Sequence, residues 1–407
     1  MSLTLLLDLD DTLLDTNLNA FMPAYFQAFS KQMASHVAPS AMLQSLINAT
    51  NQMNESEDPT HTLQEIFESD FYPGIGIAKT DLTDVIEEFF DNIFPTLAEH
   101  TQQRPDAVPL IEWALSRGYR VAIATDPLFP RKATHHRLRW AGFDPERFEV
   151  VSTFEHFHFS KTHPAYYAEV LGQLGWPDGP ILMVGNDVAR DLVPAQQLGL
   201  KTYFIDGESA SSPGFEAGRG KLADLRPWLE SINLSTLEPS FKSREAILAI
   251  MVSTPAVLHS LSASLTEEEW RHGPARDDWA MNEIVCHLRD TEREVHQMQV
   301  NLMLEKAGAF IPRPDTAVWA SERDYLNVDG ILALAEFAAA RIESLNTLEH
   351  QKLEMWARKA RHAIFGPTDF LEVTNFFADH DRLHIQQAWK TLKSLRARRV
   401  QSRRGVL

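Results

Sequence analysis

The first half of the chain alternates short apolar runs with longer amphipathic segments. The runs are four or five residues long and bounded by turn residues, which is typical of buried parallel strands. The segments between them have the apolar spacing of helices. This alternation predicts an α/β domain with a doubly wound sheet. The predicted strands are residues 3–7, 121–124, 148–151, 181–184 and 202–205, and the predicted helices are residues 106–116, 130–140, 164–174 and 188–198.

Residues 17–103 interrupt this rhythm with helical periodicity and no clear strand. The apolar runs before and after them fit one sheet, so we expect a helical cap inserted into the α/β domain. We assign residues 1–232 to this domain with its cap. Residues 233–240, which follow a stretch rich in small residues, are assigned to a linker.

The second half shows four long amphipathic segments and no alternation typical of strands. Four helices of this length suggest an antiparallel four-helix bundle, which we assign to residues 241–395. The last residues, 396–407, form an arginine-rich tail without an acidic residue. Such a tail either binds anions or is a solvated chain end. The four predicted helices are residues 241–263, 280–306, 328–348 and 368–395.

The charge balance limits the choice of partner and compartment. A net charge of −18 argues against a nucleic-acid-binding protein, which needs a basic face. The single cysteine, Cys286, cannot form a disulfide within the chain, which suits a reducing compartment, and we expect a cytoplasmic protein. The apolar run 3–7 is too short for a signal-peptide core, and we expect no membrane span.

Two carboxylates, Asp8 and Asp10, directly follow the first predicted strand. Ligands bind beyond the carboxyl ends of the strands in open α/β sheets. One acid of such a pair can be a nucleophile and metal ligand while the other acts as acid and base. A surface acidic turn is the alternative, but the leucine-rich run 3–7 directly before Asp8 argues against it.

Further polar residues stand at later strand ends. Thr125 ends the second predicted strand, where its hydroxyl could bind a phosphate oxygen. Lys161 precedes a predicted helix, where its ammonium could neutralise a phosphoryl group. Gly185 is followed by Asp187 and Asp191, two carboxylates one helical turn apart that suit Mg²⁺. Each is weak evidence alone, but their order and placement strengthen one another.

Together these features resemble the haloacid-dehalogenase superfamily, whose signature is an Asp-x-Asp-x-Thr strand end, a Ser/Thr strand end, a lysine and a Gly-Asp acidic motif. The resemblance covers about the first 230 residues. It implies a Mg²⁺-dependent phosphatase acting on a small phosphorylated metabolite, in which Asp8 forms an aspartyl phosphate and Asp10 is acid and base. It also implies that Asp8, the Asp10 backbone carbonyl and the acidic motif hold Mg²⁺. Thr12, Thr125 and Lys161 would bind the phosphate.

The acidic motif departs from the family pattern, because Asn186 stands where the family commonly has aspartate. Either Asp187 supplies the metal carboxylate in a shifted turn, or Asn186 ligates through its amide and Asp191 supplies the charge. Asp10 favours a phosphatase over a dehalogenase, since dehalogenases lack an acid at that position. A phosphomutase remains open.

The second half carries its own candidate metal site. His380 and His384 are four residues apart on the last predicted helix, so both could reach one metal. His287 lies near the apolar face of the second predicted helix, where a packed core histidine is the alternative. The pattern resembles the DinB-like metal-binding bundles over residues 241–395, which implies that these three histidines bind a divalent metal. Zn²⁺ or Ni²⁺ suits imidazole best.

Two functions from different classes follow. The first is a metabolite phosphatase in the first half, favoured by the presence of Asp8, Asp10, Thr125 and Lys161. The alternative places the main activity in the bundle, as a metal-dependent transferase or sensor of a low-molecular-weight thiol. In that case the first half would be regulatory or vestigial.

Overall fold

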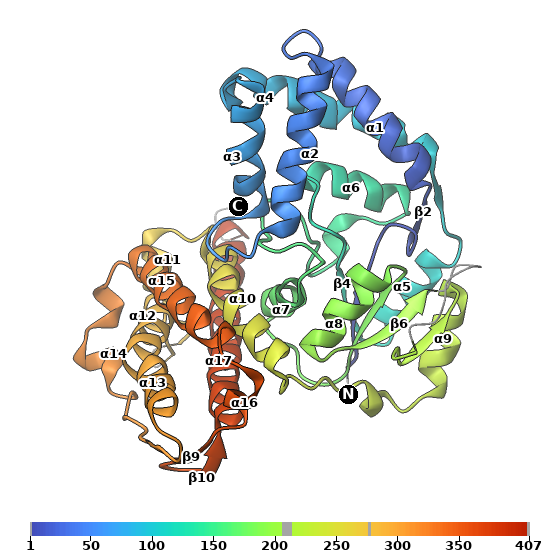
Figure 1. Cartoon of the computed structure of the whole chain (residues 1–407). Coiled ribbons are helices and arrows are strands. Elements are labelled where there is room, and N and C mark those ends of the chain that lie inside the picture. Colours follow the sequence, from blue (N-terminus) through green and yellow to red (C-terminus); the bar gives the residue numbers. More distant parts are fainter. Residues whose placement is uncertain (1, 206–213, 276–277, 405–407) are drawn as a thin grey trace. The chain divides into compact units, whose positions relative to one another are not determined.

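A computed structural model describes residues 2–205, 214–275 and 278–404 of the chain (Figure 1). It contains two compact units. The first comprises Met1–Val170 and Asp178–Ser240, and the second comprises Leu171–Pro177 and Phe241–Leu407.

The first unit is built on a five-stranded parallel sheet with the strand order β4-β1-β5-β6-β7. Its central strands β1 and β5 are buried throughout because helices cover both faces of the sheet. β1 lies between β4 and β5, with Leu7 opposite Ile123 on one side and Val184 on the other. The predicted doubly wound fold is thereby confirmed. The strands are β1 (Thr4–Leu7), β4 (Arg120–Ile123), β5 (Ile181–Gly185), β6 (Lys201–Ile205) and β7 (Gly218–Gly220).

The helices of this unit fall close to the predicted segments. One predicted strand, residues 148–151, is wrong: Val151 forms only a single bridge to Ile123. A 3₁₀ turn at Pro145–Arg147 leads into this stretch, and β4 ends at Ile123, so no ladder can extend. The helices are α5 (Ala107–Ser116), α6 (Arg131–Trp140), α7 (Pro164–Gln173), α8 (Val193–Leu198), which follows a π-helical turn at Val188–Leu192, and α9 (Leu222–Ser231).

The expected helical insertion is present and has an aromatic core of its own. Phe21, Phe29, Phe89 and Phe94 are buried in it. It lies between β2 (Leu14–Thr16) and β3 (Thr101–Gln103), an antiparallel pair that the sequence did not predict. Strands of three residues are too short to show a period of two. The cap helices, drawn in blue in Figure 1, are α1 (Leu18–Met33), α2 (Pro39–Glu55), α3 (Leu63–Ile75) and α4 (Lys79–Glu88).

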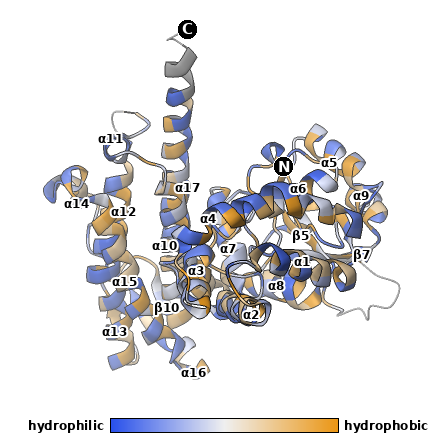
Figure 2. Cartoon of the chain, turned by 90° about the horizontal axis from the view of Figure 1, so that it is seen from above, coloured by the Kyte–Doolittle hydropathy of each residue, from blue (hydrophilic) through white to orange (hydrophobic). Residues whose placement is uncertain are grey.

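The second unit is a four-helix bundle whose helices are amphipathic, with hydrophobic and hydrophilic residues alternating along them in Figure 2. The helices are α10 (Arg244–Ser262), α12 (Met281–Thr291) continued by α13 (Gln297–Glu305), α15 (Gly330–Glu349) and α17 (Phe370–Arg404). A π-helical turn at Glu292–His296 joins α12 to α13.

The direction of the helices differs from a simple up-down bundle. Asn282, at the start of α12, donates to the carbonyl oxygen of Val328 just before α15 (2.7 Å), so these two helices run parallel. Arg399, late in α17, donates to the carbonyl oxygen of Ser264 just after α10 (3.0 Å), so α10 and α17 also run parallel. Arg244 at the start of α10 contacts Glu349 at the end of α15. The bundle therefore consists of two parallel pairs that are antiparallel to each other.

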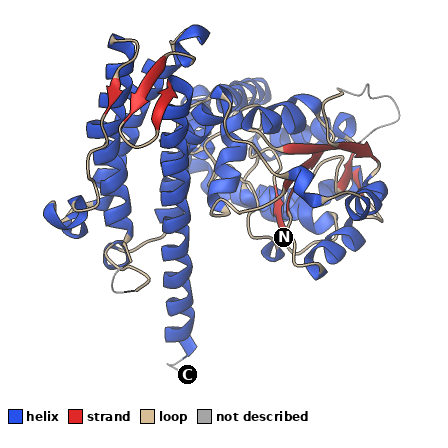
Figure 3. Ribbon diagram, turned by 90° about the horizontal axis from the view of Figure 1, so that it is seen from below, coloured by secondary structure: helices blue, strands red, loops and turns tan. Residues whose placement is uncertain are grey.

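Three short strands lie at one end of the bundle, where the sequence showed no strand pattern (Figure 3). They are β8 (Phe310–Ile311), β9 (Lys359–His362) and β10 (Gly366–Asp369). At the other end α17 continues to Arg404, so most of the expected basic tail is helical. The last tail residues, 405–407, lie outside the described residues.

One described helix, α10, is long and apolar enough to cross a membrane by length and composition. Of its most apolar 18-residue window, 72% is buried inside the structure. The place of α10 in the bundle core accounts for this apolarity.

Candidate catalytic and metal-binding centres

The first candidate centre lies where three strands of the sheet end together. The backbone N–H of Ala124 donates to the carbonyl of Leu7 (2.8 Å), and that of Asp8 donates to the carbonyl of Val184 (3.0 Å). The residues that directly follow β4, β1 and β5 therefore meet at one edge. The strand order reverses here, since β1 has β4 on one side and β5 on the other, and such switch points are where α/β sheets bind ligands.

Asp8 is almost fully buried at this edge, at 6% exposure. Its Oδ1 atom accepts a hydrogen bond from the Lys161 ammonium (2.7 Å), and its Oδ2 atom accepts one from the Thr12 hydroxyl (3.0 Å). Lys161 also forms an ion pair with the buried carboxylate of Asp191. A Cβ atom at Gly185 would lie 2.2 Å from Asp191 Oδ2, so glycine is needed there. One ammonium thus lies between two buried carboxylates.

The charges of this centre depend on one another. Burial, reinforced by Asp191, raises the pKa of Asp8 to about 7, although Lys161 opposes the rise. Burial would lower the pKa of Lys161, but Asp191 and Asp8 outweigh it and hold that pKa well above its usual value. Lys161 is therefore charged at neutral pH while Asp8 is near its midpoint. An added cation would favour the ionised, nucleophilic form of Asp8.

Asp10 is held by two partners outside the strand-end motif. Its carboxylate accepts a hydrogen bond from the Thr16 hydroxyl (2.9 Å) and forms an ion pair with Arg137 of α6. The guanidinium of Arg137 also lies 4.7 Å from the ring centre of Phe129. Arg137 was not predicted from the sequence. The sequence did contain one indication: Arg137 stands next to the apolar Leu138, on the face of α6 that is buried.

The acidic motif contributes Asn186 rather than Asp187 to the centre. With its amide nitrogen turned inward, Asn186 donates to the Asp10 carbonyl oxygen (3.1 Å), the Thr12 hydroxyl (3.2 Å) and Asp8 Oδ2 (3.2 Å); a half-turn of the amide presents its oxygen to the same three atoms instead. Asp187 is exposed, and its carboxylate accepts the backbone N–H groups of Ala189 (2.8 Å) and Arg190 (3.1 Å) as a helix cap. Three oxygen atoms therefore surround the Asn186 amide, a donor set that suits a hard cation such as Mg²⁺.

Thr125 is buried and lies two residues after the end of β4. Its carbonyl oxygen accepts hydrogen bonds from the hydroxyls of Ser152 (2.5 Å) and Tyr166 (2.8 Å), which fix its position. The neighbouring Asp126 accepts the backbone N–H of Lys161 (3.3 Å). The structure thus brings the predicted residues of the first half to one sheet edge, with the side chain of Asp187 turned to other partners.

The second candidate centre is a cluster of three imidazoles in the bundle. His287 comes from α12, and His380 and His384 come from α17. The Nε2 atom of His380 lies 3.1 Å from that of His287 and 3.2 Å from that of His384. The Trp279 ring lies 5.0 Å from the His287 ring and is stacked on His384 at 5.8 Å. Three imidazole nitrogen atoms therefore converge beside the Trp279 ring.

Burial keeps these imidazoles neutral. It lowers the pKa of His287 to about 3, with the nearby His384 and His296 contributing. It also lowers the pKa of His380 well below its usual value, and that of His384 is lowered too. Neutral imidazoles have lone pairs free for a metal. A cluster of three suits a borderline cation such as Zn²⁺ or Ni²⁺.

A buried charge network surrounds this cluster and was not predicted. The fully buried Arg341 of α15 bonds to Glu292 (2.8 Å) and forms an ion pair with Asp381 of α17. Glu292 also bonds to the Nδ1 atom of His296 (2.9 Å). Glu292 and His296 belong to the π-helical turn after α12, and such turns are frequent at functional sites. The signal in the sequence was an arginine on an apolar helix face.

Comparisons with known proteins match each half of the chain separately. The family model of haloacid dehalogenase-like hydrolases matches residues 3–199, and that of the DinB superfamily matches residues 251–388. A curated relative, the pyrophosphatase PpaX of Bacillus cereus (strain AH820), is 26% identical over 241 residues, which cover 57% of this chain and 98% of the relative.

Two solved structures have low overall similarity to the chain. A HAD phosphatase from Thermococcus onnurineus has a TM-score of 0.39 at 19% identity, covering 56% of this chain and 98% of its own. YfiT from Bacillus subtilis, described as a probable metal-dependent hydrolase with an unusual four-helix bundle topology, has a TM-score of 0.35 at 17% identity, covering 38% and 89%. Such low scores add nothing to the two family matches.

Proposed function

Because residues 3–199 form a haloacid dehalogenase-like hydrolase domain and residues 251–388 form a DinB-like domain, we propose that the chain is a Mg²⁺-dependent phosphatase with a separate metal site in its second half. One observation carries the first part. Lys161 holds Asp8 and Asp191 together at the switch point of the sheet, with Asp10 two residues from Asp8. The substrate is a small phosphorylated metabolite.

The proposed reaction has two steps. An oxygen of Asp8 bonds to phosphorus as the bond from phosphorus to the leaving oxygen breaks, and Asp10 gives that oxygen a proton. Water then attacks the phosphorus of the aspartyl phosphate, Asp10 takes a proton from the water, and phosphate leaves. Thr12, Thr125 and Lys161 bind the phosphoryl oxygens and balance their charge. Arg137 keeps the Asp10 carboxylate oriented.

The residues that would hold Mg²⁺ are Asp8, Asn186 and the backbone carbonyl of Asp10, with Asp191 adding negative charge beside them. Asn186 would bind through its amide oxygen, and the three oxygen atoms that this amide faces support the assignment, because a cation among them would favour the orientation with the oxygen inward. Mg²⁺ when bound stabilises the ionised nucleophile and the negative charge of the phosphoryl group. Asp187 is not a ligand in this proposal, because its carboxylate caps the helix that follows.

The test is a panel of phosphorylated metabolites assayed with and without Mg²⁺. Asp8→Asn should lower turnover by at least about a thousandfold, or about 4 kcal/mol of barrier, since an amide is no nucleophile. Asp15→Asn is the matched control, because Asp15 is exposed on β2. Near-normal turnover by the Asp8→Asn chain would remove Asp8 from the mechanism.

The convergence of three Nε2 atoms supports the second part of the proposal, a Zn²⁺ or Ni²⁺ site at His287, His380 and His384. Three protein ligands leave room for water or a low-molecular-weight thiol, so metal-dependent thiol chemistry or sensing is the second candidate function. Elemental analysis should find one equivalent of metal in the wild-type chain and in the control His350→Ala, and far less in His384→Ala. Equal metal in all three chains would contradict the site.

A further inference from the structure

The cap contains a large cavity to which the proposed reaction assigns no role. Its volume is about 710 Å³, within the range of small-molecule sites. Helices α1 to α4 form most of its wall. Residues 128–132 and 154–155 of the α/β domain complete it.

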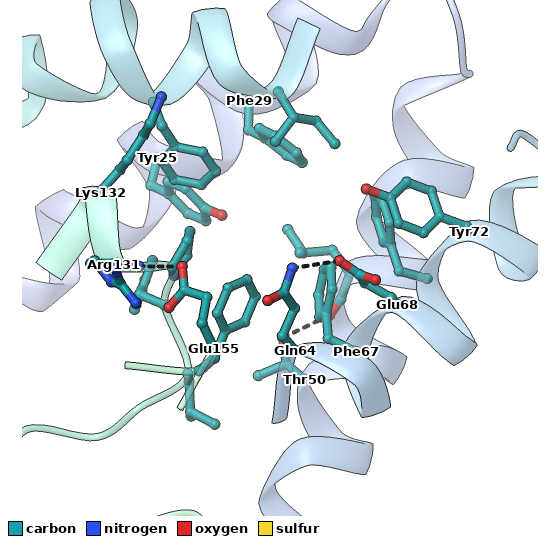
Figure 4. A pocket seen from close by; sticks show the side chains of 18 of the residues that line it. Tyr25, Phe29, Thr50, Gln64, Phe67, Glu68, Tyr72, Arg131, Lys132 and Glu155 are labelled. Carbon is teal, nitrogen blue, oxygen red and sulfur yellow. Dashed lines mark hydrogen bonds between the residues drawn. The ribbon is translucent and has the colours of Figure 1, made fainter. Parts of the chain in front are cut away.

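The wall of the cavity is rich in aromatic side chains. Nine of the side chains that line it are phenylalanine or tyrosine. Figure 4 shows Tyr25 and Phe29 on one side of the cavity and Phe67 and Tyr72 on the other. The Tyr25 ring also contacts Phe129 of the α/β domain, with ring centres 5.5 Å apart. An occupant would therefore contact carbon atoms from both the cap and the α/β domain.

The charges along the wall balance. Three acidic and three basic side chains line the cavity. Lys79 forms an ion pair with Glu68 (2.7 Å), and Lys132 forms ion pairs with Glu87 and Asp91. The third cation, Arg131, donates a hydrogen bond to His156. A second phosphate or a carboxylate on the occupant would find both lysines already paired, so the wall suits an uncharged group.

Two chains of contacts link the cavity to the Asp8 centre. Phe129 lines the cavity and lies against Arg137, which forms the ion pair with Asp10. On α2, Thr50 lines the cavity and accepts a hydrogen bond from Asn54 (3.1 Å). The Asn54 carbonyl in turn accepts the hydroxyl of Ser160 (3.2 Å), directly before Lys161. Contacts therefore connect the cavity wall to Arg137, which pairs with Asp10, and to Ser160, which directly precedes Lys161.

We propose that this cavity binds the leaving group, and that the substrate is a phosphate monoester of a large, uncharged, apolar alcohol or phenol. The inference rests on the proposed function, since the phosphoryl group would occupy the Asp8 centre. Removing apolar surface from water contributes about 0.8 kcal/mol per methylene, or about fourfold in affinity. Leaving groups that fill the cavity should therefore be strongly preferred over short or highly polar ones.

The test compares kcat/KM for n-alkyl phosphates from methyl to octyl, and for 2-naphthyl phosphate, in the presence of Mg²⁺. The value should rise about three- to fourfold per methylene before it levels off. Phe67→Ala should lower it at least tenfold for octyl and 2-naphthyl phosphate and leave methyl phosphate nearly unchanged. The control is Leu18→Ala, because Leu18 is an exposed residue of α1 that is not among the residues lining the cavity. It should behave as the wild-type chain.

Equilibrium dialysis with 2-naphthol separates this inference from the proposed function. Binding that Phe67→Ala weakens and Leu18→Ala does not would support the cavity as the apolar site. Binding that is absent, or equal in all three chains, would overturn the inference. Equal kcat/KM for methyl and octyl phosphate, both abolished by Asp8→Asn, would also overturn it while leaving the phosphatase intact. Hydrolysis of no phosphate ester at all would overturn the proposed function itself.

Discussion

The two candidate centres are both buried, yet burial has opposite consequences for them. In the first, burial raises the pKa of Asp8 to about 7, and Lys161 compensates the charges of Asp8 and Asp191. In the second, burial lowers the pKa of His287 to about 3, and the cluster carries no charge. The first centre therefore depends on cations to ionise its nucleophile. The second already has its lone pairs available for a metal.

Removing the ammonium should give the largest effect. Lys161→Met leaves two buried carboxylates without their counter-charge, which costs about 3–5 kcal/mol of unfolding free energy. It should also lower phosphatase turnover by at least about a thousandfold, as loss of a main phosphoryl-binding cation would. Urea unfolding measures the stability, and Mg²⁺ should restore part of it. The control is Lys201→Met, at an exposed site on β6. Unchanged stability of the Lys161→Met chain would show that the carboxylates do not need the ammonium.

Lowering the pH should affect metal binding at the two centres differently. Protons compete with Mg²⁺ for Asp8, so the Mg²⁺ concentration for half-maximal activity should rise as pH falls below about 7, by up to about tenfold per unit. The bundle metal should stay bound to about pH 5, because burial lowers the pKa of all three histidines. Titrations of activity with Mg²⁺ at each pH measure the first effect, and the metal content of the chain after dialysis measures the second. The proposed difference between the two centres would be contradicted if the Mg²⁺ requirement did not change from pH 5.5 to 8. Loss of metal from the bundle near pH 6.5 would also contradict it.

Asp8 should also make the stability of the metal-free chain depend on pH. The unfolded side chain ionises near pH 3.9, whereas the folded one keeps its proton to about 7. Between about pH 4 and 7 the folded chain therefore keeps a proton on Asp8 that the unfolded chain has lost. The unfolding free energy should fall as the pH rises through this range, so the contribution of Asp8 to stability is fully present below about pH 4 and is lost by about pH 7. Asp8→Asn should remove this part of the pH dependence.

The acidic motif offers a smaller and sharper test. Asn186→Ala should raise the Mg²⁺ requirement about tenfold or more, with little change in unfolding free energy. Asp187→Ala should do the reverse: a loss of about 1 kcal/mol of stability from the missing helix cap and an unchanged Mg²⁺ requirement. The opposite ranking in a Mg²⁺ titration would make Asp187 the ligand in a shifted turn.

The fold could be predicted where a local pattern is long enough to be recognised. The central strands and the long helices have that length, and the fold class and both family resemblances are confirmed. The short strands β2, β3 and β8 offer too few residues for a period to show. The parallel pairing of α12 with α15 depends on a crossing connection, which no local pattern encodes.

The candidate sites divide in the same way. Asp8, Lys161 and the pair His380 and His384 lie in motifs that are compact in sequence, so their residue types and spacing were informative. Arg137 and Arg341 act across the fold, and only their position on apolar helix faces indicated them. The choice between Asn186 and Asp187 depends on the turn after β5, where the backbone turns one side chain inward and uses the other as a cap.

The most direct test of the central claim, that Asp8 forms an aspartyl phosphate, uses the Asp10→Asn chain with 4-nitrophenyl phosphate and Mg²⁺. This leaving group needs little help from an acid, so phosphorylation of Asp8 should proceed, while hydrolysis should stall without the base. Acid quenching followed by mass spectrometry should find one phosphoryl group on the peptide that contains Asp8, with a burst of one nitrophenol per chain. No burst and no phosphoryl group on that peptide would contradict the claim.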